Sequence, residues 1–390
     1  MELEIFLEPI DRTKFKVKKN AFGRIIDIYT KSGEFPDLNG KDIAIVGVNE
    51  DRGSLENKGC SKAPDVIRAQ LFKLYPNFTK TSSIVDIGNI NPGENIKDTY
   101  FALSEVISNL AKKNITTIIL GGSQDLTYAN YLGYEKLEQI INIVSVDKKF
   151  DIDTELKEIN SDNFLNKIIL HQPNFLFNYS NLGFQTYFES QESIDLMSKL
   201  HFDTFRLGEM NQDGIKEMEP TLRNTDIVSF DIASVRQSDA PAAATSTPNG
   251  LYGEEFCQLA WYSGLSDKVS SVGFYEYNPS LDKRNQTALL ISQAVWYFIN
   301  GFYNRKNEFP SMNEEQFLKF RVIIEEQEHE IVFFKSTMSD RWWMNVPYPD
   351  SSSASKYNRQ RLVPCSYDDY KKACNEDIPE RWWKTYQKLL

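Results

Sequence analysis

Acidic side chains lie directly after apolar runs at several places in the chain. The segment INIVSVDKKFD (141–151) starts as an apolar run and ends with Asp147 and Asp151, which flank two lysines. The segments TTIILGGSQD (116–125) and DIVSFDIASVRQSD (226–239) have the same form. Taken singly, an aspartate after a strand is usually a turn residue or a helix cap. If these turns meet at one edge of a sheet, however, they have the geometry of a metal or anion site.

A parallel sheet would bring these turns together, and the sequence predicts one. Short apolar runs rich in β-branched residues recur, as expected for strands covered on both faces. They are residues 42–48, 84–88, 115–120, 141–147, 175–180, 204–208, 226–232 and 269–277. Segments with helical periodicity accompany them, at 64–75, 98–114 and 285–302. We therefore expect a three-layer α/β fold with an eight-stranded parallel sheet and helices on both faces, whose ligands bind beyond the carboxyl ends of the strands.

The chain changes character after this alternating region. We expect an N-terminal segment (1–40), the α/β domain (41–304) and a C-terminal extension (305–390). In the extension, the pattern favours an acidic helix at 313–328 and a strand at 330–336. Two Arg-Trp-Trp triplets follow, and their tryptophans either anchor a protein partner or pack against the main domain; they are Trp342, Trp343, Trp382 and Trp383.

Composition excludes some classes of partner. The chain has 390 residues, with Lys+Arg 44 against Asp+Glu 55 and a net charge of −11, so its field repels nucleic acid.

No apolar run approaches the roughly 20 residues of a membrane span, and the first residues do not resemble a signal peptide, so we expect a cytoplasmic protein. The cysteines are scattered and are expected to be free thiols; they are Cys60, Cys257, Cys365 and Cys374.

In their order, the polar turns resemble the motifs of the ureohydrolase family, which includes arginase, agmatinase and formiminoglutamase. That family has GGDHS, DAHxD and SFDxDxxDPxxAPGTGTPxxGGLxxxE, which here read GGSQD (121–125), DKKFD (147–151) and SFDIASVRQSDAPAAATSTPNGLYGEE (229–255). Similar stretches are GCSKAPDVIRAQL (59–71) and VGFYEYNPSLDKRNQTALLISQAV (272–295). The resemblance covers residues 42 to 304 and implies the arginase-like fold.

The resemblance implies two manganese ions held by four aspartates and two histidines, with a bridging water that attacks an amidine or guanidine carbon. The aspartates at matching positions are Asp147, Asp151 and Asp231. Gln124 and Lys149 stand where the family has its histidines, and Ala233 replaces the fourth aspartate. An ammonium about 4 Å from a metal ion costs on the order of 4 kcal/mol even at an effective dielectric of 20, so Lys149 opposes the second metal and can replace its charge.

Three interpretations follow from these replacements. The first is a catalytically impaired pseudoenzyme without metal, in which Lys149, with Lys148, neutralises the acidic pocket, and which has a structural, partner-binding or ligand-sensing role. The second is a hydrolase of guanidine or amidine C–N bonds, or a binding protein, with one Mn²⁺ or Mg²⁺ held by Asp147, Asp151, Asp231 and Gln124. The third is different chemistry with Lys149 as base or nucleophile. We favour the first.

Two further residues are candidates through the resemblance. Glu255 falls where the family's GLxxxE motif places a carboxylate facing a guanidinium or amidine, although acids are also favoured in the first turn of a helix at 253–265. His171 is near the position of a proton-shuttling histidine in some members, although a histidine between apolar residues is commonly just packed. Arg236 and Gln237 lie where they could partly fill the space of the lost ligand. The resemblance also implies self-association and a small guanidino or amidino ligand.

Overall fold

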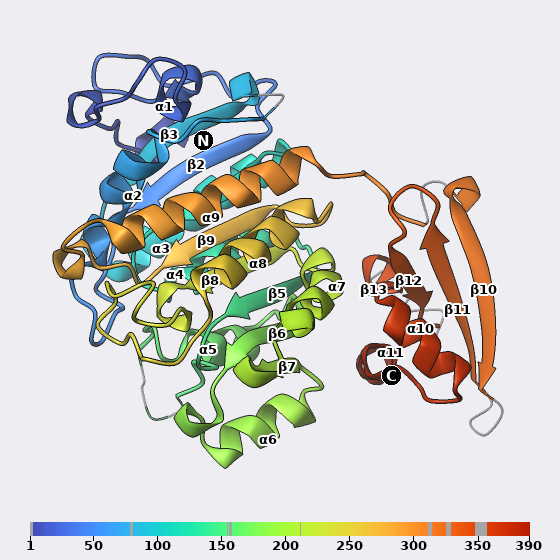
Figure 1. The fold of residues 1–390 in the computed structure, drawn as a ribbon. Coiled ribbons are helices and arrows are strands. Elements are labelled where there is room, and N and C mark those ends of the chain that lie inside the picture. The colour runs from blue at the N-terminus through green and yellow to red at the C-terminus, as the bar shows by residue number, and fades with distance from the viewer. Residues whose placement is uncertain are drawn as a thin grey trace.

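The computed structural model describes residues 3–78, 81–153, 155, 158–210, 212–310, 314–324, 329–347 and 357–390. These residues form a large α/β domain and a smaller C-terminal module beside it (Figure 1).

A parallel sheet forms the centre of the α/β domain. Its strands are β1 (Asp27–Ile28), β2 (Ile43–Val48), β3 (Ile84–Ile90), β4 (Thr116–Leu120), β5 (Ile141–Val146), β6 (Leu176–Phe184), β7 (Asp203–Arg206), β8 (Ile227–Asp231) and β9 (Ser271–Tyr275). Their order is β1-β3-β2-β4-β9-β8-β5-β6-β7, and every pairing is parallel. The predicted parallel sheet is confirmed, but it has nine strands and not eight. The additional strand, β1, is two residues long and pairs Asp27 with Val85, which is too short to give a periodic pattern.

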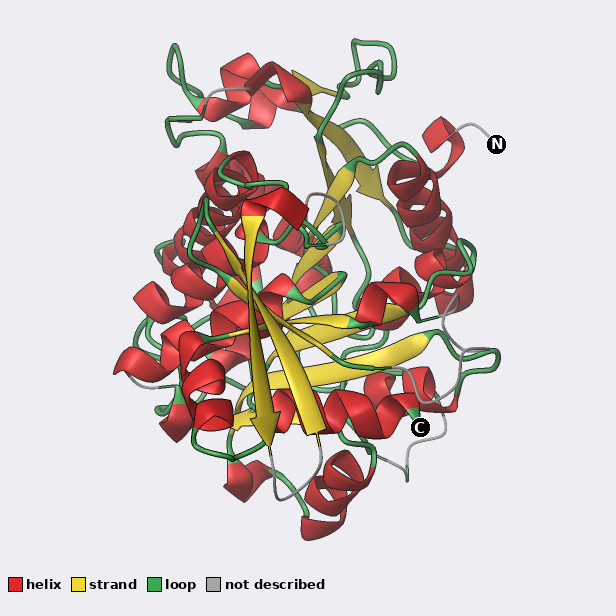
Figure 2. Cartoon of the chain, turned by 90° about the vertical axis from the view of Figure 1, so that its right-hand side faces the viewer, coloured by secondary structure: helices red, strands yellow, loops and turns green. Residues whose placement is uncertain are grey.

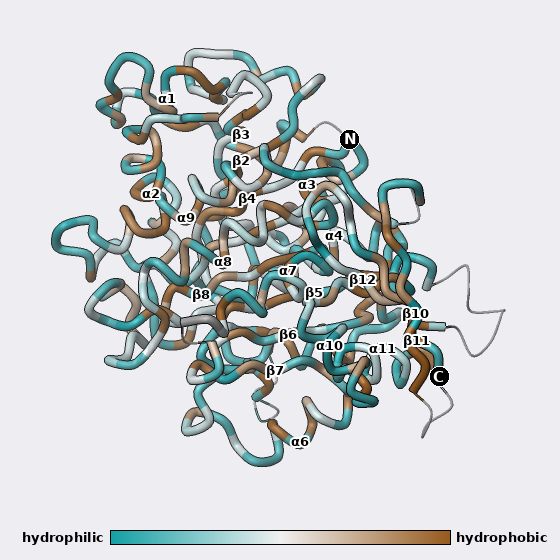
Figure 3. The backbone as a smooth tube through the Cα atoms, turned by 45° about the vertical axis from the view of Figure 1, so that its right-hand side comes forward, coloured by the Kyte–Doolittle hydropathy of each residue, from teal (hydrophilic) through white to brown (hydrophobic). Residues whose placement is uncertain are grey.

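Helices cover both faces of this sheet, as expected. They are α1 (Phe22–Ile25), α2 (Ala63–Leu71), α3 (Ile96–Lys112), α4 (Leu126–Glu135), α5 (Phe164–Leu170), α6 (Gln191–Lys199), α7 (Glu219–Arg223), α8 (Gly253–Leu265) and α9 (Gln286–Tyr303). One apolar core joins the sheet to α2, α8 and α9, and a second joins it to α3, α4 and α5. Ile43 and Ile45 belong to the first core, whereas Ala44 and Val46 belong to the second, so β2 is buried on both faces. Hydrophobic residues are concentrated along these strands and helices, whereas the outer loops are mainly hydrophilic (Figure 3).

The C-terminal module has its own antiparallel sheet. Its strands are β10 (Phe317–Ile324), β11 (His329–Ser336), β12 (Trp342–Asn345) and β13 (Leu362–Cys365), in that order, and α10 (Tyr367–Cys374) and α11 (Glu380–Leu389) pack with them. The two long strands β10 and β11 stand at the front of Figure 2. The predicted strand at 330–336 is confirmed within β11.

The predicted helix at 313–328 is wrong. Residues 317–324 form β10, which pairs along its whole length with β11, from Phe317 opposite Ser336 to Ile324 opposite His329. The segment FLKFRVII is rich in aromatic and β-branched residues, which favour a pleated strand once a partner is available. Residues 313 and 325–328 of the predicted helix lie outside the described residues.

Polar contacts attach the module to the α/β domain. Arg223, at the end of α7, lies 4.3 Å from the ring centre of Trp343, and its Nη2 donates to the carbonyl oxygens of Trp342 and Cys365, each at 3.2 Å. Arg381 of α11 donates to Thr221 of α7 at 2.5 Å. These bonds hold the module against the edge of the domain where the strands begin.

The four tryptophans of the Arg-Trp-Trp triplets differ in how deeply they are buried, and the partner-binding role expected for them stays a prediction. Trp342, Trp343 and Trp382 are buried, whereas the Trp383 residue is 43% exposed. Packing therefore accounts for three of the four residues. All four cysteines are free thiols, as predicted. Among the described residues, no helix has both the length and the apolar character that crossing a membrane would require.

The adjacent residues Trp382 and Trp383 provide a matched test of the module's core. Trp382→Ala removes a fully buried ring whose Nε1 donates to the Asn345 carbonyl at 2.9 Å. We expect it to lower the free energy of unfolding by about 3–5 kcal/mol. Trp383→Ala should cost less, at about 1 kcal/mol, because that residue is 43% exposed and not fully buried. Urea titration monitored by circular dichroism, together with native-state hydrogen exchange, measures the loss of unfolding free energy in both variants. Equal losses in the two variants would contradict this packing.

Candidate functional site

The polar turns meet at one edge of the sheet, beyond the carboxyl ends of four adjacent strands. Gln124 follows β4, Glu276 follows β9, Asp231 ends β8 and Asp147 follows β5. They line one cavity, whose walls are Ser54, Glu56, Asn57, Gln124, Asp147, Lys148, Lys149, Asp151, Ser161, Asp162, Asp231, Thr245 and Glu276. The structure thus brings together the predicted residues of the three turns. Glu276 was not assigned to the site from the sequence, although it lies in the family-like stretch 272–295, directly after the end of β9.

Four carboxyl groups that line this cavity are buried, those of Asp147, Asp151, Asp231 and Glu276. Asp231 Oδ1 accepts the Ala233 N–H at 2.7 Å, and Asp147 Oδ1 accepts the Lys149 N–H at 3.0 Å. Within the described part of the chain, Asp147 Oδ2 and Asp151 Oδ2 are buried and have no hydrogen-bond partner. Burial raises the pKa of each carboxyl, and the charge of Asp147 adds to the rise at Asp151 and at Asp231. These carboxylates therefore need positive charge nearby to stay ionised.

Two lysines supply positive charge. Lys148 is only 4% exposed, and its Nζ donates to the Thr245 carbonyl oxygen and lies 5.4 Å from the ring centre of Phe188. Its charge lowers the pKa of both Asp147 and Asp231, against the effect of their burial. The Lys149 side chain is 34% exposed, and its Nζ lies 3.8 Å from Asp162 Oδ2. Burial opposes the charge of Lys149, but Asp162 and Asp151 outweigh it and raise the pKa of the ammonium.

Gln124 is held by two neighbours. Its backbone N–H donates to Glu276 Oε1 at 2.9 Å, and its side-chain Nε2 donates to Ser229 Oγ at 3.3 Å. The side chain also lowers the pKa of Asp147 through a hydrogen bond. In this orientation Gln124 presents an N–H to the carboxylates, so its amide would have to rotate before its oxygen could bind a cation.

Glu276 lines the cavity and belongs to a buried polar network. Its Oε2 accepts Asn57 Nδ2 at 2.9 Å and Ser54 Oγ at 3.3 Å, and burial raises the pKa of its carboxyl to about 7. Both Glu276 and Asp151 have left-handed backbone conformations, with φ of 61° and 56°. Such residues cost about 1–3 kcal/mol each and tend to cluster at functional sites. The strain at both positions supports this cavity as the functional site.

The side chains present do not fit a pair of manganese ions. No group of three or more histidine, cysteine, aspartate or glutamate side chains in the described ranges is arranged to hold a metal ion. The cavity volume is 20 Å³, enough for about one water molecule. The buried ammonium of Lys148 also lines this space. A second dication would therefore meet both a shortage of ligands and a positive charge from the chain itself.

The structure places two of the predicted residues away from this cavity. His171 lies between α5 and β6, toward the amino ends of the strands, where Nδ1 is 3.0 Å from the Tyr128 hydroxyl and Nε2 is 3.0 Å from Glu135 Oε2. Glu255 lies in the first turn of α8, and its Oε2 accepts the Tyr252 N–H at 2.8 Å as a helix cap. Neither lines the cavity. These contacts match the packing and helix-cap alternatives for the two residues.

Arg236 also points elsewhere than expected. Its Nε lies 3.0 Å from Asp239 Oδ2, and its guanidinium stacks 3.8 Å from the ring centre of Tyr252. Neither Arg236 nor Gln237 lines the cavity, whereas Ala233 is fully buried. The space of the missing carboxylate is therefore not filled by this loop.

Comparison with known proteins gives the family. The sequence model described as "Arginase family" matches residues 41–300. The formimidoylglutamase of Staphylococcus aureus (strain JH9) is 28% identical over 273 residues, which cover 66% of this chain and 85% of that protein. No part of the C-terminal module falls within the family match.

Solved structures have the same fold over the α/β domain. The formimidoylglutamase of Bacillus subtilis has a TM-score of 0.65 at 18% identity, covering 76% of this chain and 97% of that one. The formiminoglutamase of Trypanosoma cruzi, solved with Mn²⁺, has a TM-score of 0.63 at 17% identity, covering 70% and 100%. With its parallel sheet and its polar turns at one sheet edge, the chain belongs to the Arginase family.

Proposed function

We propose that this protein is a catalytically impaired member of the Arginase family, in which two lysines take the place of metal charge. The observation that carries the proposal is the buried Lys148 ammonium, with Lys149 beside it, in a cavity lined by four buried carboxyl groups. Four buried carboxyls and Asp162 line this space with the two lysines, and the raised pKa values of Asp151, Asp231 and Glu276 favour protonation of the carboxyls that the lysines leave uncompensated. The pocket therefore reaches electrical balance without a metal ion.

This balance leaves the pocket without the group that performs hydrolysis in a two-metal site. Paired metals acidify a water molecule and make it a nucleophile at neutral pH. Here Lys148 Nζ is engaged with the Thr245 carbonyl oxygen and is not free to act as a base. An amidinium or guanidinium pairs well with carboxylates, but the space of 20 Å³ would have to open at Lys149 and Asp162 before such a group could enter. From this pairing we propose a ligand-sensing or partner-binding role based on a small guanidino or amidino compound.

The relatives favour a second candidate function, hydrolysis of an amidine or guanidine C–N bond with one divalent cation. The matched relatives are formimidoylglutamases, and the unpartnered oxygens of Asp147 and Asp151 favour a cation between them. Asp147, Asp151 and Asp231 would hold one Mn²⁺ or Mg²⁺, which would acidify water less than a bridged pair does. Lys148 would have to leave the carboxylates in that state.

Metal analysis together with an activity assay separates the two candidates. After dialysis against Mn²⁺ or Mg²⁺, we expect the purified protein to contain no stoichiometric metal, because the lysines already compensate the carboxylates. We also expect no release of urea, ammonia or formamide from guanidino and formimino substrates. Elemental analysis and product assays check both. One equivalent of metal with turnover would support the second candidate, and two equivalents with turnover would rule out the proposal.

Restoring the family pattern tests the role of Lys148 directly. We expect the quadruple variant Gln124→His, Lys148→Ala, Lys149→His, Ala233→Asp to bind two Mn²⁺ ions, measured by calorimetry and electron paramagnetic resonance. The matched control is the triple variant that keeps Lys148. Because this ammonium lines the same cavity, the triple variant should bind the second ion at least about tenfold more weakly. Equal binding by the two variants would show that Lys148 does not exclude the metal.

A further inference from the structure

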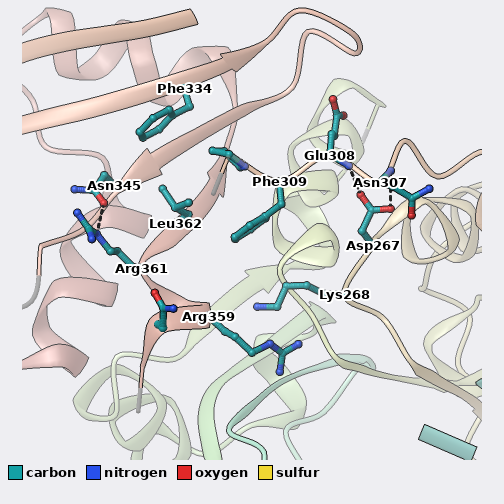
Figure 4. A pocket seen from close by; sticks show the side chains of 12 residues that line it. Asp267, Lys268, Asn307, Glu308, Phe309, Phe334, Asn345, Arg359, Arg361 and Leu362 are labelled. Carbon is teal, nitrogen blue, oxygen red and sulfur yellow. Dashed lines mark hydrogen bonds between the residues drawn. The ribbon is translucent and has the colours of Figure 1, made fainter. Parts of the chain in front are cut away.

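A second and larger cavity lies between the α/β domain and the C-terminal module. Its volume is 560 Å³, within the usual range for small-molecule sites. The domain contributes Lys268, from the loop between α8 and β9. The module and the segment that leads to it contribute Phe309, Phe334, Arg359 and Leu362, so the cavity exists only because the two parts pack together (Figure 4).

Two cations form one end of this cavity. Lys268 Nζ donates to Asn224 Oδ1 at 2.9 Å, and Arg359 Nη2 lies 2.7 Å from Asp226 Oδ1. Asp226 is fully buried and also accepts the Asn142 N–H at 2.9 Å. Burial lowers the pKa of Lys268 to about 8, and the charge of Asp226 opposes this shift. The single carboxylate of Asp226 therefore balances only one of the charges of Lys268 and Arg359, and one positive charge is in excess at this end.

The acidic residues of the cavity are engaged elsewhere. Asp267 accepts the backbone N–H groups of Asn307 and Glu308, each at 3.2 Å. The Glu308 carboxylate accepts the Ser336 hydroxyl at 2.5 Å and lies 3.6 Å from Arg341 Nη1. In Figure 4 the Glu308 side chain points away from Phe309. The charge of Asp267 is offset by Arg305, which lowers its pKa against the effect of burial, and that of Glu308 by Arg341, so neither carboxylate cancels the excess positive charge at Lys268 and Arg359.

The rest of the cavity offers apolar surface. Phe309, Phe334 and Leu362 are each half-buried, and Figure 4 shows the ring of Phe309 extending toward Leu362 and Lys268. Apolar side chains left partly uncovered around a concave space are typical of ligand sites. Arg361, on the wall near Leu362, donates Nε to Asn345 Oδ1 at 2.7 Å. An occupant would meet a cationic end and an apolar body of the cavity.

We propose that this cavity binds a small monocarboxylate whose carboxylate group lies against Lys268 and Arg359 and whose aromatic or branched aliphatic body lies against Phe309, Phe334 and Leu362. At the end formed by Lys268 and Arg359 the excess is one positive charge, which matches a carboxylate better than a phosphate dianion, whereas Arg361 lies on another part of the wall against Asn345. The Arg359 guanidinium has the planar donor geometry that suits a carboxylate, and the described residues bond only its Nη2. The site is at the opposite edge of the sheet from the cavity of Asp147 and needs no metal.

Calorimetry on the full chain tests the proposal with phenylacetate and 4-methylpentanoate as probes. We expect saturable binding with a dissociation constant of about 1 mM or tighter, no binding of the uncharged phenylacetamide, and no binding of inorganic phosphate. If the amide bound as tightly as the acid, recognition of the carboxylate by Lys268 and Arg359 would be wrong. If phosphate bound as tightly as phenylacetate, the proposed role of the apolar part of the cavity would be wrong. Absence of saturable binding for both acids would overturn the proposal.

Variants then locate the bound acid. Lys268→Met keeps the length of the side chain but removes its charge, so it should weaken phenylacetate binding about tenfold or more. Phe309→Ser, outside the helices and strands, should weaken it as well. The matched control Lys73→Met changes an exposed lysine that does not line the cavity and should leave binding unchanged. If both cavity variants bind like the control, the acid is bound elsewhere and the assignment is wrong.

Discussion

The structure of the site depends on the cost of burying carboxylates together. Asp147, Asp151 and Asp231 come from two strand ends that are neighbours in the sheet, so the fold places their charges side by side whatever else the sequence does. Water cannot screen them there, and each pKa rises. Such a cluster persists only with a compensating cation. In this chain the compensating charge is provided by Lys148 and Lys149, in the same turn as two of the aspartates.

Lys148 and Lys149 are adjacent in the sequence but differ in burial and in their contacts. Backbone geometry sends neighbouring side chains in different directions, so Lys148 turns inward to the Thr245 carbonyl while Lys149 reaches Asp162 near the rim. Alignment with the family motif drew attention to Lys149, because it stands at the position of a histidine. Lys148, which was named from the sequence only beside Lys149 and which stands where the motif has alanine, is the more deeply buried of the two charges in the structure.

Much of the fold could be predicted from the sequence, because both faces of the central strands are covered and leave long apolar runs. The two-residue β1 could not, since it has no pattern of its own and forms only by pairing with β3. The segment 317–324 was assigned to a helix because local composition carries no information about its distant partner β11. The convergence of the turns was predictable from parallel topology, whereas the position of His171 at the opposite edge depended on packing against Tyr128 and Glu135.

Anomalous diffraction from crystals soaked in Mn²⁺ tests the central claim most directly, because it locates metal ions irrespective of activity. The account predicts no manganese peak between Asp147, Asp151 and Asp231, with density for Lys148 Nζ lining the same space. Two manganese peaks bridged by Asp147 and Asp231, with the Lys148 side chain displaced, would contradict it.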